Sequence, residues 1–245
     1  MPLTAIILAA GAGTRLGALG RRHSKPMVPI AGQPLIGWLI TRLRAAGVER
    51  LVVVGHASDE PLRSYLQDTQ GDAQLVIQSE RRGIADAVRL ALPVVTEDAG
   101  YLACACDSLF DSHDIAQLIA CGRTQPHAAV VGVLEMGRAA TATRSAVLLD
   151  GERVTQVVEK PAPGSVASAG VALPVYWLPR AMSNYIERVR PLGTERYIST
   201  ALNDFVAAGG TVLAVRMHGR LEVTTAEDAE RADILLRSSQ SESIR

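Results

Sequence analysis

The sequence predicts an α/β fold with a mostly parallel central sheet, helices on both faces of that sheet and a small antiparallel addition. Two observations lead to this prediction. Apolar runs rich in β-branched residues alternate with amphipathic stretches in the first half of the chain, and the second half changes to a hairpin pattern. Strands that are almost continuously apolar and separated by helices indicate a parallel sheet covered on both faces.

The alternating segments of the first half define the parallel part of the sheet. Ligands bind outside the carboxyl ends of parallel strands, so residues that directly follow these strands are the first candidates for a site. The predicted strands are Leu3–Leu8, Leu51–Val54, Gln74–Ile77, Tyr101–Ala105 and Ala128–Val133. The predicted helices between them are Pro34–Ala46, Asp59–Gln67, Ile84–Leu92 and Ser112–Ala120.

The second half supplies the antiparallel addition. Ser145–Leu149 and Val154–Val158 flank Asp150-Gly151, which is a tight-turn hairpin signal. The polar end after Arg237 is expected to fray. Because the sequence shows no repeat and no linker, we expect a single domain over residues 1–237 and a flexible tail over 238–245. The remaining predicted strands are Val171–Trp177, Thr211–Arg216 and Leu221–Val223, and the remaining helices are Pro179–Val189, Arg196–Ala208 and Thr225 to about Arg237.

Composition excludes several classes of protein. The chain has 245 residues, 48% hydrophobic and 20% charged, which is typical of a globular protein with a sizeable core. The 25 basic and 25 acidic residues balance, so no nucleic-acid or membrane partner is indicated, while a homo-oligomer is compatible with the sequence. No apolar run reaches the roughly 18 residues that span a bilayer, and the N-terminus lacks the basic start of a signal peptide. Cys104, Cys106 and Cys121 fit neither a disulfide framework nor a four-ligand zinc site, so we expect a reduced, cytoplasmic protein.

Lysine is rare in this chain. Of the 25 basic residues only Lys25 and Lys160 are lysine, and the rest are arginine. Lysine is a compact point charge and a frequent phosphate ligand, whereas arginine is a planar fork that needs a wider slot. Both lysines precede a proline, which restricts the backbone and so limits where the side chain points. We interpret them as phosphate ligands rather than as surface lysines that survived a bias toward arginine.

A glycine-rich loop, Leu8 to Leu16, contains the end of the first strand and the residues that follow it. Small residues and glycines at a strand end let backbone N–H groups approach a phosphate chain. A dinucleotide-binding fingerprint is disfavoured because the third glycine, Gly17, comes one residue late, and a Walker loop would end in Gly-Lys-Ser/Thr. A bare turn and a polyphosphate-binding loop remain, and Arg15 within the loop and Lys25 after it favour polyphosphate.

With Ser24-Lys25-Pro26-Met27, this loop resembles the signature of the sugar nucleotidyltransferase family, which includes glucose-1-phosphate thymidylyl- and uridylyltransferases. The match extends from Ala5 to about Ala232. The resemblance implies a Rossmann-like fold and Mg²⁺-dependent transfer of a nucleotidyl group from a nucleoside triphosphate to a sugar 1-phosphate, with release of pyrophosphate. The further elements that recur in order are Gln78–Ala87, Asp107 after its strand, Val158–Pro161, Ser168–Val171 and Gly219–Asp228.

The resemblance also implies roles for individual residues. Gln78 and Gly83 would read the edge of a pyrimidine, so UTP or dTTP is favoured over a purine nucleotide. The acceptor phosphate is ionised near neutral pH because its second pKa is ~6, so no general base is required. The implied catalytic residues are Arg15 and Lys25; the nucleotide-binding residues are Leu8, Ala10, Gly11, Gly13, Thr14, Gln78 and Gly83; the substrate-binding residues are Ser145, Glu159, Lys160 and Ser168; the Mg²⁺ ligands are Asp107 and Glu222.

Departures from the family pattern concern the acceptor more than the fold. Ser168 stands where many members have asparagine, Thr200 replaces a frequent aspartate, Glu222 stands where the second metal ligand is normally aspartate, and Cys106 replaces a glycine. Sites that hydrogen-bond a substrate hydroxyl discriminate strongly, so these changes bear on which substrate is accepted. Two alternatives therefore stay open: a cytidylyltransferase-type enzyme acting on a non-sugar phosphate or phosphonate, and a non-catalytic nucleotide-sugar-binding regulator.

The residues alone leave simpler interpretations of three positions. Asp107 suits Mg²⁺ at the carboxyl end of a strand, although it could instead begin a helix, for which Asp111 or Ser112 is the better cap. Gln78 could be an exposed polar residue at a strand end, and Glu159 with Lys160 a surface pair. The five histidines show no ligand spacing, and we expect surface or structural roles for them.

Overall fold

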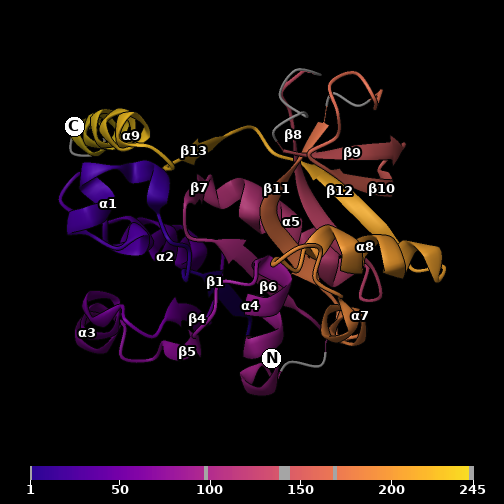
Figure 1. Ribbon diagram of the computed structural model, residues 1–245, viewed down its shortest axis with the longest axis horizontal. Coiled ribbons are helices and arrows are strands. Elements are labelled where there is room, and N and C mark those ends of the chain that lie inside the picture. The colour runs from indigo at the N-terminus through magenta and orange to yellow at the C-terminus, as the bar shows by residue number, and fades with distance from the viewer. Residues whose placement is uncertain (1, 97–98, 138–143, 168–169, 243–245) are drawn as a thin grey trace.

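A nine-stranded sheet runs through the part of the chain that the structure describes (Figure 1). The structure is a computed structural model, and it describes residues 2–96, 99–137, 144–167 and 170–242. The order of the strands across the sheet is β5-β4-β1-β6-β11-β8-β12-β10-β9. The predicted α/β class is confirmed, with one difference in the direction of the strands.

The first four strands of this order are parallel, as predicted. They are β5 (Gln74–Gln78), β4 (Arg50–His56), β1 (Thr4–Leu8) and β6 (Tyr101–Ala105). Leu8 pairs with Ala105 on one side and with Val54 on the other, so the strands end at one common edge. The residues that follow β1 and β6 therefore lie side by side.

The other half of the sheet is mixed. Strand β11 (Gly170–Leu178) is antiparallel to both β6 and β8 (Ala129–Glu135), whereas β12 (Val212–Arg216) is parallel to β8. Apolar patterns mark where a strand lies but not the direction of its long-range pairing, so the sequence did not reveal that β11 is antiparallel to its neighbours. The predicted parallel arrangement thus holds for β5, β4, β1 and β6 and for the β8–β12 pair, and the other pairs are antiparallel. The predicted hairpin, β9 (Ser145–Asp150) and β10 (Arg153–Glu159), closes this edge of the sheet.

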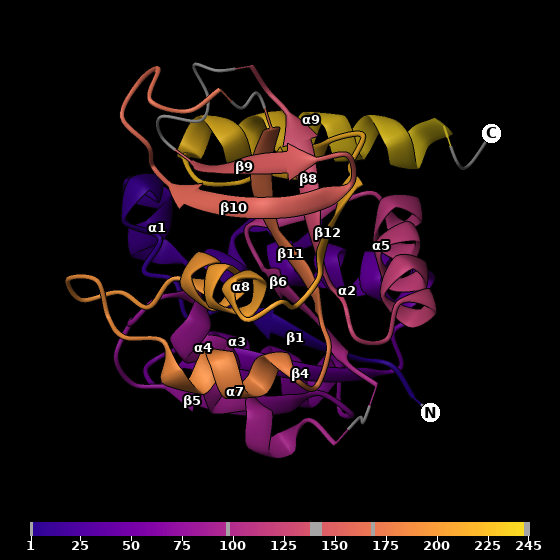
Figure 2. The same cartoon turned by 90° about the vertical axis from the view of Figure 1, so that its right-hand side faces the viewer.

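Helices cover both faces of the sheet, as predicted. Side chains alternate along β1, so Ala5 and Ile7 join one hydrophobic cluster and Ile6 and Leu8 join the other. Helices α2 and α5 bury their apolar residues in the first cluster, and α4, α7 and α8 bury theirs in the second. Figure 2 shows α8 below the β9–β10 hairpin, against which it packs. The bounds are α1 (Ala18–Arg22), α2 (Leu35–Ala45), α3 (Glu60–Thr69), α4 (Ile84–Ala91), α5 (Ser112–Thr124), α7 (Met182–Arg188), α8 (Ile198–Ala207) and α9 (Ala226–Glu242).

Several short elements were not predicted. These are β7 (Ser108–Phe110), β2 (Pro29–Ile30) and β3 (Gln33–Pro34), of which β2 pairs with β3. Strand β7 pairs with β13 (Arg220–Glu222), which lies one residue before the predicted strand Leu221–Val223. Helix α9 continues to Glu242, so the predicted end near Arg237 is too early, and residues 238–242 of the predicted tail are helical. An ion pair between Asp233 and Arg237 at 2.6 Å, one turn apart, stabilises the helix just before this extension.

Two expectations about the chain as a whole can be compared with the structure. Cys104, Cys106 and Cys121 are free thiols, and burial raises the pKa of Cys106 to about 12, as expected for a small core residue. Among the described residues, none of the helices combines the length and the apolar character that a bilayer crossing requires.

Candidate active site

Lys25 and Asp107 form an ion pair at the common edge of β1 and β6. The Lys25 Nζ lies 2.6 Å from Asp107 Oδ2, and the lysine is only 8% exposed. The Ser108 hydroxyl donates to Asp107 Oδ1 at 3.1 Å. Helix α5 is capped instead by Asp111, which accepts the His113 N–H at 2.8 Å, so the interpretation of Asp107 as a helix cap is wrong. The two residues predicted from their sequence positions alone are thus in direct contact.

The segment before Lys25 is fixed by a second carboxylate. The Ser24 hydroxyl donates to Asp59 Oδ1 at 2.8 Å. Asp59 is buried and caps helix α3 through the N–H of Leu62. Lys25 therefore follows a residue that is anchored to a helix terminus, which restricts the movement of its backbone.

The glycine-rich loop lies against Lys25. Gly13 has a left-handed backbone (φ +63°), and a Cβ at this position would lie 3.3 Å from the Lys25 Cβ. Gly11 is exposed and has open space where a Cβ would be. Thr14 and Arg15 lie in an exposed 3₁₀ turn, and Arg15 makes no ion pair with any residue that the structure describes. The loop therefore exposes backbone groups and the Arg15 guanidinium at this edge of the sheet. Leu8 and Ala10 are largely buried.

Gln78, at the end of β5, is buried rather than exposed. Its Nε2 donates to Asp86 Oδ2 at 3.0 Å. Burial alone would raise the pKa of Asp86, but hydrogen bonds from Gln78 and Arg89 and the charges of Arg89 and Arg196 outweigh burial and lower it. An ionised carboxylate only accepts hydrogen bonds, so the Gln78 amide must face it through nitrogen. The side-chain carbonyl oxygen of Gln78, Oε1, accepts no hydrogen bond from a described residue.

Gly83 is required by a close approach of two chain segments. It has φ +88°, and a Cβ would lie 2.7 Å from the carbonyl oxygen of Arg196. The Arg196 N–H donates to the Arg82 carbonyl at 2.7 Å, so the chain before α8 braces the segment after β5. Arg81 Nε donates to the Ala10 carbonyl at 2.9 Å and connects this segment to the glycine-rich loop. Arg81 and Arg196 were not among the predicted site residues.

The residues predicted to bind the acceptor substrate lie at the open end of the β9–β10 hairpin. Ser145 faces Glu159 across the hairpin, and its hydroxyl donates to Glu159 Oε2 at 2.8 Å. Ser199, on α8, donates to Oε1 at 2.6 Å and was not predicted. Glu159 and Lys160 make no ion pair among the described residues, so the surface-pair interpretation does not describe them. Lys160 is exposed and has a left-handed backbone (φ +41°), and Ser168 lies outside the described residues.

Glu222 lies beside Asp107 but is already paired. It stands opposite Ser108 in the β7–β13 pair, and the next residue, Val223, donates its N–H to the Asp107 carbonyl at 2.8 Å. Glu222 Oε2 accepts from Arg144 at 2.7 Å and from Arg220 at 2.8 Å. Oε1 accepts no hydrogen bond from a described residue. The sequence did not indicate either arginine.

Among the described residues, the carboxylates at this edge are of the kind that bind Mg²⁺. They contain no group of three or more histidine, cysteine or acidic side chains that could hold a metal. Mg²⁺ is commonly held by one or two carboxylates together with substrate phosphates. Asp107, with a side chain 25% exposed, and Oε1 of Glu222 are hard oxygen donors of the required kind.

Comparison with protein families identifies the chain. Residues 4–221 match the family model described as Nucleotidyl transferase, and the match includes every predicted site residue except Glu222. The chain belongs to the nucleotidyl transferase family. This confirms the family resemblance predicted from the sequence motifs.

Two curated relatives illustrate the similarity of this nucleotidyl transferase to known proteins. The UTP–glucose-1-phosphate uridylyltransferase AglF of Haloferax volcanii is 27% identical over 241 residues, covering 94% of this chain and 95% of the relative. The bifunctional protein GlmU of Pelotomaculum thermopropionicum is 28% identical over 237 residues, covering 93% of this chain and 50% of the relative. The chain thus spans about half the length of this GlmU, and 20% of the GlmU of Rubrobacter xylanophilus is covered by a shorter match.

Solved structures share the fold. The UTP-bound UGPase from Acinetobacter baumannii has a TM-score of 0.82 at 20% identity, covering 96% of this chain and 93% of that one. A putative glucose-1-phosphate thymidylyltransferase from Bacillus anthracis has a TM-score of 0.84 at 20% identity, covering 96% and 95%. At these identities the likeness concerns the fold, and it supports the α/β class.

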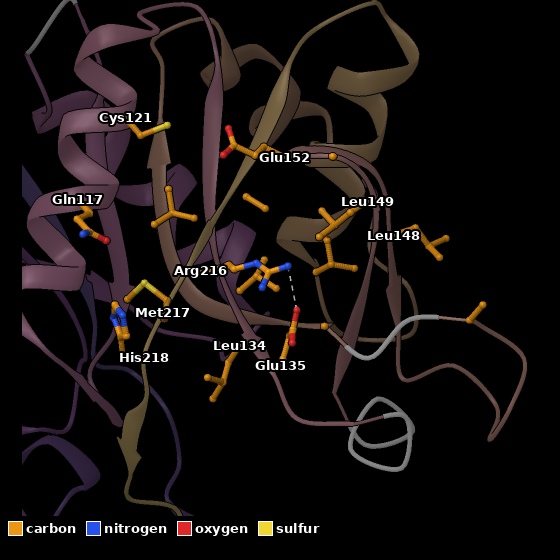
Figure 3. Close-up of a pocket in the computed structure, with 17 residues that line it drawn as sticks. Gln117, Cys121, Leu134, Glu135, Leu148, Leu149, Glu152, Arg216, Met217 and His218 are labelled. Atoms are coloured by element: carbon orange, nitrogen blue, oxygen red, sulfur yellow. Dashed lines mark ion pairs between the residues drawn. The ribbon is translucent and has the colours of Figure 1, made fainter.

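The nucleotidyl transferase chain also has a pocket of about 1040 Å³ away from the predicted site (Figure 3). Helix α5 and strands β8, β9 and β12 contribute its lining, which includes Cys121, Met217 and Leu134. Of its charged groups, Arg216 and Glu135 pair with each other at 3.1 Å. None of the predicted site residues that the structure describes lines it, so we place the candidate active site at the strand ends.

Proposed function

We propose that this protein transfers a nucleotidyl group from a nucleoside triphosphate, with UTP or dTTP favoured, to a sugar 1-phosphate and releases pyrophosphate. The observation that carries the proposal is the Lys25–Asp107 pair at 2.6 Å beside the glycine-rich loop. A lysine point charge next to a metal-binding carboxylate and a loop of approachable backbone suits a bound triphosphate. The relative named UTP–glucose-1-phosphate uridylyltransferase supports the substrate class.

The proposed reaction is an in-line displacement at the α-phosphorus. An oxygen of the acceptor phosphate forms a bond to the α-phosphorus, and the bond from that phosphorus to the bridging oxygen breaks, so pyrophosphate leaves with the electron pair. The acceptor needs no general base because its second pKa is ~6. Catalysis then consists of positioning and charge neutralisation. Lys25 neutralises charge near the α-phosphate, Arg15 holds the β- and γ-phosphates, and Lys160 holds the acceptor phosphate.

The loop and the two carboxylates complete the nucleotide side. Backbone N–H groups of the glycine-rich loop approach the phosphates, and the proposed contacts are Leu8, Ala10, Gly11, Gly13 and Thr14. Asp107 and Glu222 would hold Mg²⁺, which when bound supplies positive charge to the phosphate oxygens. Asp107 also orients Lys25, whose ammonium has no other carboxylate partner among the described residues.

Gln78 and Gly83 are the proposed base-reading residues. Asp86 fixes the Gln78 amide through its nitrogen, which leaves the carbonyl oxygen as an acceptor. The N3–H of uracil or thymine is a donor that matches this acceptor, whereas the corresponding ring nitrogen of adenine is an acceptor. Gly83, which has no side chain, lets this segment pack directly against the backbone of Arg196. We therefore expect UTP or dTTP to be used better than ATP.

The acceptor side is organised by Glu159. Each of its carboxylate oxygens accepts one serine hydroxyl, from Ser145 and from Ser199, which fixes the plane of the carboxylate. Each oxygen retains a lone pair that can accept a hydroxyl of the sugar. We propose that Ser168 contributes a further polar contact to the same substrate.

A pyrophosphate-release screen tests the function. Five nucleoside triphosphates are combined with sugar 1-phosphates and, in parallel, with phosphocholine-type and phosphonate acceptors. The proposal predicts release that depends on both a pyrimidine nucleotide and a sugar 1-phosphate. Release only with CTP and a non-sugar acceptor would support the cytidylyltransferase alternative, and binding of a nucleotide sugar without any release would support the regulator.

A further inference from the structure

Arg144 links the acceptor side of the site to the metal side. It directly precedes β9, and its carbonyl accepts the N–H of Lys160 at 3.1 Å. Its guanidinium reaches across to β13, where Nη2 lies 2.7 Å from Glu222 Oε2. In the β7–β13 pairing Glu222 stands opposite Ser108, the residue after Asp107, and the Val223 N–H donates to the Asp107 carbonyl at 2.8 Å. Arg144 thus stands between the proposed ligand of the acceptor phosphate and the proposed ligands of the metal.

Glu222 does not need Arg144 for charge compensation. Arg220 is the more buried of its two partners, with a side chain 6% exposed, and it alone matches the charge of the carboxylate. Arg144 has a side chain 29% exposed, and among the described residues its guanidinium makes only the contact to Glu222. A guanidinium has five N–H donors in a fixed fork, so most of its donors are free for a planar or tetrahedral anion.

The charge of a phosphate group indicates that a second cation is needed beside Lys160 at the end of the hairpin. A phosphate monoester carries about −1.5 to −2 charges at neutral pH, which Lys160 alone does not balance. Lys160 and Arg144 together supply two positive charges from adjacent backbone positions. Lys160 also holds a left-handed backbone at φ +41°, an unfavourable conformation of the kind that occurs at functional sites.

We propose that Arg144 is a second ligand of the acceptor phosphate, acting beside Lys160 while one of its N–H groups stays on Glu222. This inference rests on the proposed function. The same guanidinium then places the acceptor phosphate next to the carboxylates that hold the metal, so that the attacking oxygen and the α-phosphorus are brought together. Arg144 would therefore contribute to the choice of a phosphorylated acceptor as well as to its orientation.

Substitutions of Arg144 test this proposal, because they should change the KM for the sugar 1-phosphate but not the Kd for the nucleotide. Arg144→Met removes the charge and should raise the KM for the sugar 1-phosphate by roughly 10- to 100-fold, because charge-assisted hydrogen bonds are lost. The Kd for the nucleotide, measured by calorimetry without acceptor, should change less than about twofold. Arg144→Lys keeps the charge and should recover part of the acceptor affinity. Arg153 is an exposed arginine on the same hairpin, and Arg153→Met should leave both constants unchanged.

A purely structural role through Glu222 is distinguished by a double-mutant cycle. If Arg144 contacts the acceptor, Arg144→Met raises the acceptor KM in the Glu222→Gln background as well. No further effect in that background, or an equal loss of nucleotide and acceptor affinity, would overturn the proposal. An active wild type with an unchanged acceptor KM in Arg144→Met overturns this inference alone, whereas a wild type that releases no pyrophosphate with any acceptor overturns the proposed function and this inference together.

Discussion

Lys25 shows how one side chain is held in a single place by several neighbours. The lysine is 8% exposed, its ammonium is paired with Asp107, and Gly13 lies against its Cβ. Ser24, one residue earlier, is tied to Asp59. A planar guanidinium would have to fit into the same narrow space.

We predict that Lys25→Arg lowers kcat by at least about 100-fold, the magnitude typical of removing one preorganised group that stabilises a transition-state charge. The charge is kept, but its centre moves and broadens. Steady-state kinetics give the value, and a thermal melt shows that the variant is folded. Arg153→Lys, the reverse exchange at an exposed position, should retain kcat. A near-normal kcat in Lys25→Arg would remove this residue from catalysis.

Glu222 combines two proposed roles, and one substitution measures both. Glu222→Gln keeps the shape but leaves the buried Arg220 without a carboxylate, so the free energy of unfolding should fall by about 1–3 kcal/mol. The Mg²⁺ concentration for half-maximal rate should rise, because one oxygen donor loses its charge. Denaturant unfolding and a Mg²⁺ titration are the measurements.

The matched control for Glu222 is Glu135, whose ion pair with Arg216 is highly exposed. Glu135→Gln should change the free energy of unfolding by less than about 1 kcal/mol. If Glu222→Gln keeps both the stability and the Mg²⁺ dependence of the wild type, then the second metal ligand lies elsewhere.

Residues that follow a strand could be chosen from the sequence, and Glu222 from the family resemblance, whereas contacts between distant segments could not be predicted. Asp107 follows an apolar run directly, and Lys25 is one of two lysines, so both could be chosen from the sequence. Arg144 and Glu222 are 78 positions apart and meet only because the hairpin and β13 converge. In a chain with many arginines, nothing local distinguishes Arg144 from the others.

At the scale of elements, the loop between β12 and β13 is fixed by a buried carboxylate on α5. Asp114 is 1% exposed, and it accepts the His218 N–H at 2.8 Å and pairs with His218 Nδ1 at 2.6 Å. The hydrogen bond and the charge of Asp114, with a further contribution from Asp111, raise the pKa of His218. The histidine thus has the structural role that we expected, and it positions the chain that leads to Glu222.

This contact predicts a specific pH dependence. Because the pKa of His218 is higher in the folded than in the unfolded state, its stabilisation is complete below the unfolded value of 6.5 and is lost as pH rises through the folded value. The stability difference between wild type and His218→Gln should therefore shrink from pH 5 to pH 9 in thermal melts. The exposed His127, changed to glutamine, is the control. A difference that stays constant over this range would contradict the assignment.

The close contact between Gly83 and the backbone of Arg196 predicts that position 83 does not tolerate a side chain. Gly83→Ala combines a left-handed backbone with a Cβ 2.7 Å from a carbonyl oxygen, so we expect a loss of about 2–4 kcal/mol in unfolding free energy. Gly209 has nearly the same φ, +85°, but nothing lies within 4 Å of a Cβ there, and Gly209→Ala should cost about 1 kcal/mol. Denaturant unfolding of both variants separates the contact from the backbone strain. Equal losses would show that Arg196 does not brace this segment.

Most elements were predictable because hydrophobic periodicity marks them. The strand Tyr101–Ala105 and the hairpin have the expected positions. Strand β7 was missed, since a three-residue strand carries too little periodicity and depends on its pairing, here with β13. The place of β11 in the middle of the sheet also follows from long-range pairing, which local sequence patterns do not contain.

At the scale of the whole molecule, one sheet connects the nucleotide side to the acceptor side. The proposed nucleotide side has Asp107, the partner of Lys25, and Gln78 at the ends of parallel strands, and the antiparallel hairpin on the proposed acceptor side carries Glu159 and Lys160. Figure 1 shows the chain returning from β12 through β13 to α9, beside the helices of the first half. This return brings Glu222 next to Asp107, and we propose that residues 1–237 act as one domain for this reason.

Phosphorus NMR of the reaction mixture tests the central claim of nucleotidyl transfer most directly. The protein is incubated with UTP or dTTP, a sugar 1-phosphate and Mg²⁺. We predict that the triphosphate and sugar-phosphate signals disappear. The signals of pyrophosphate and of the diphosphate group in the nucleotide sugar should grow in equal amounts. Both changes should be strongly slowed in Lys25→Arg. Orthophosphate as the only product, or unchanged substrates for every acceptor that the wild type is offered, would contradict the account.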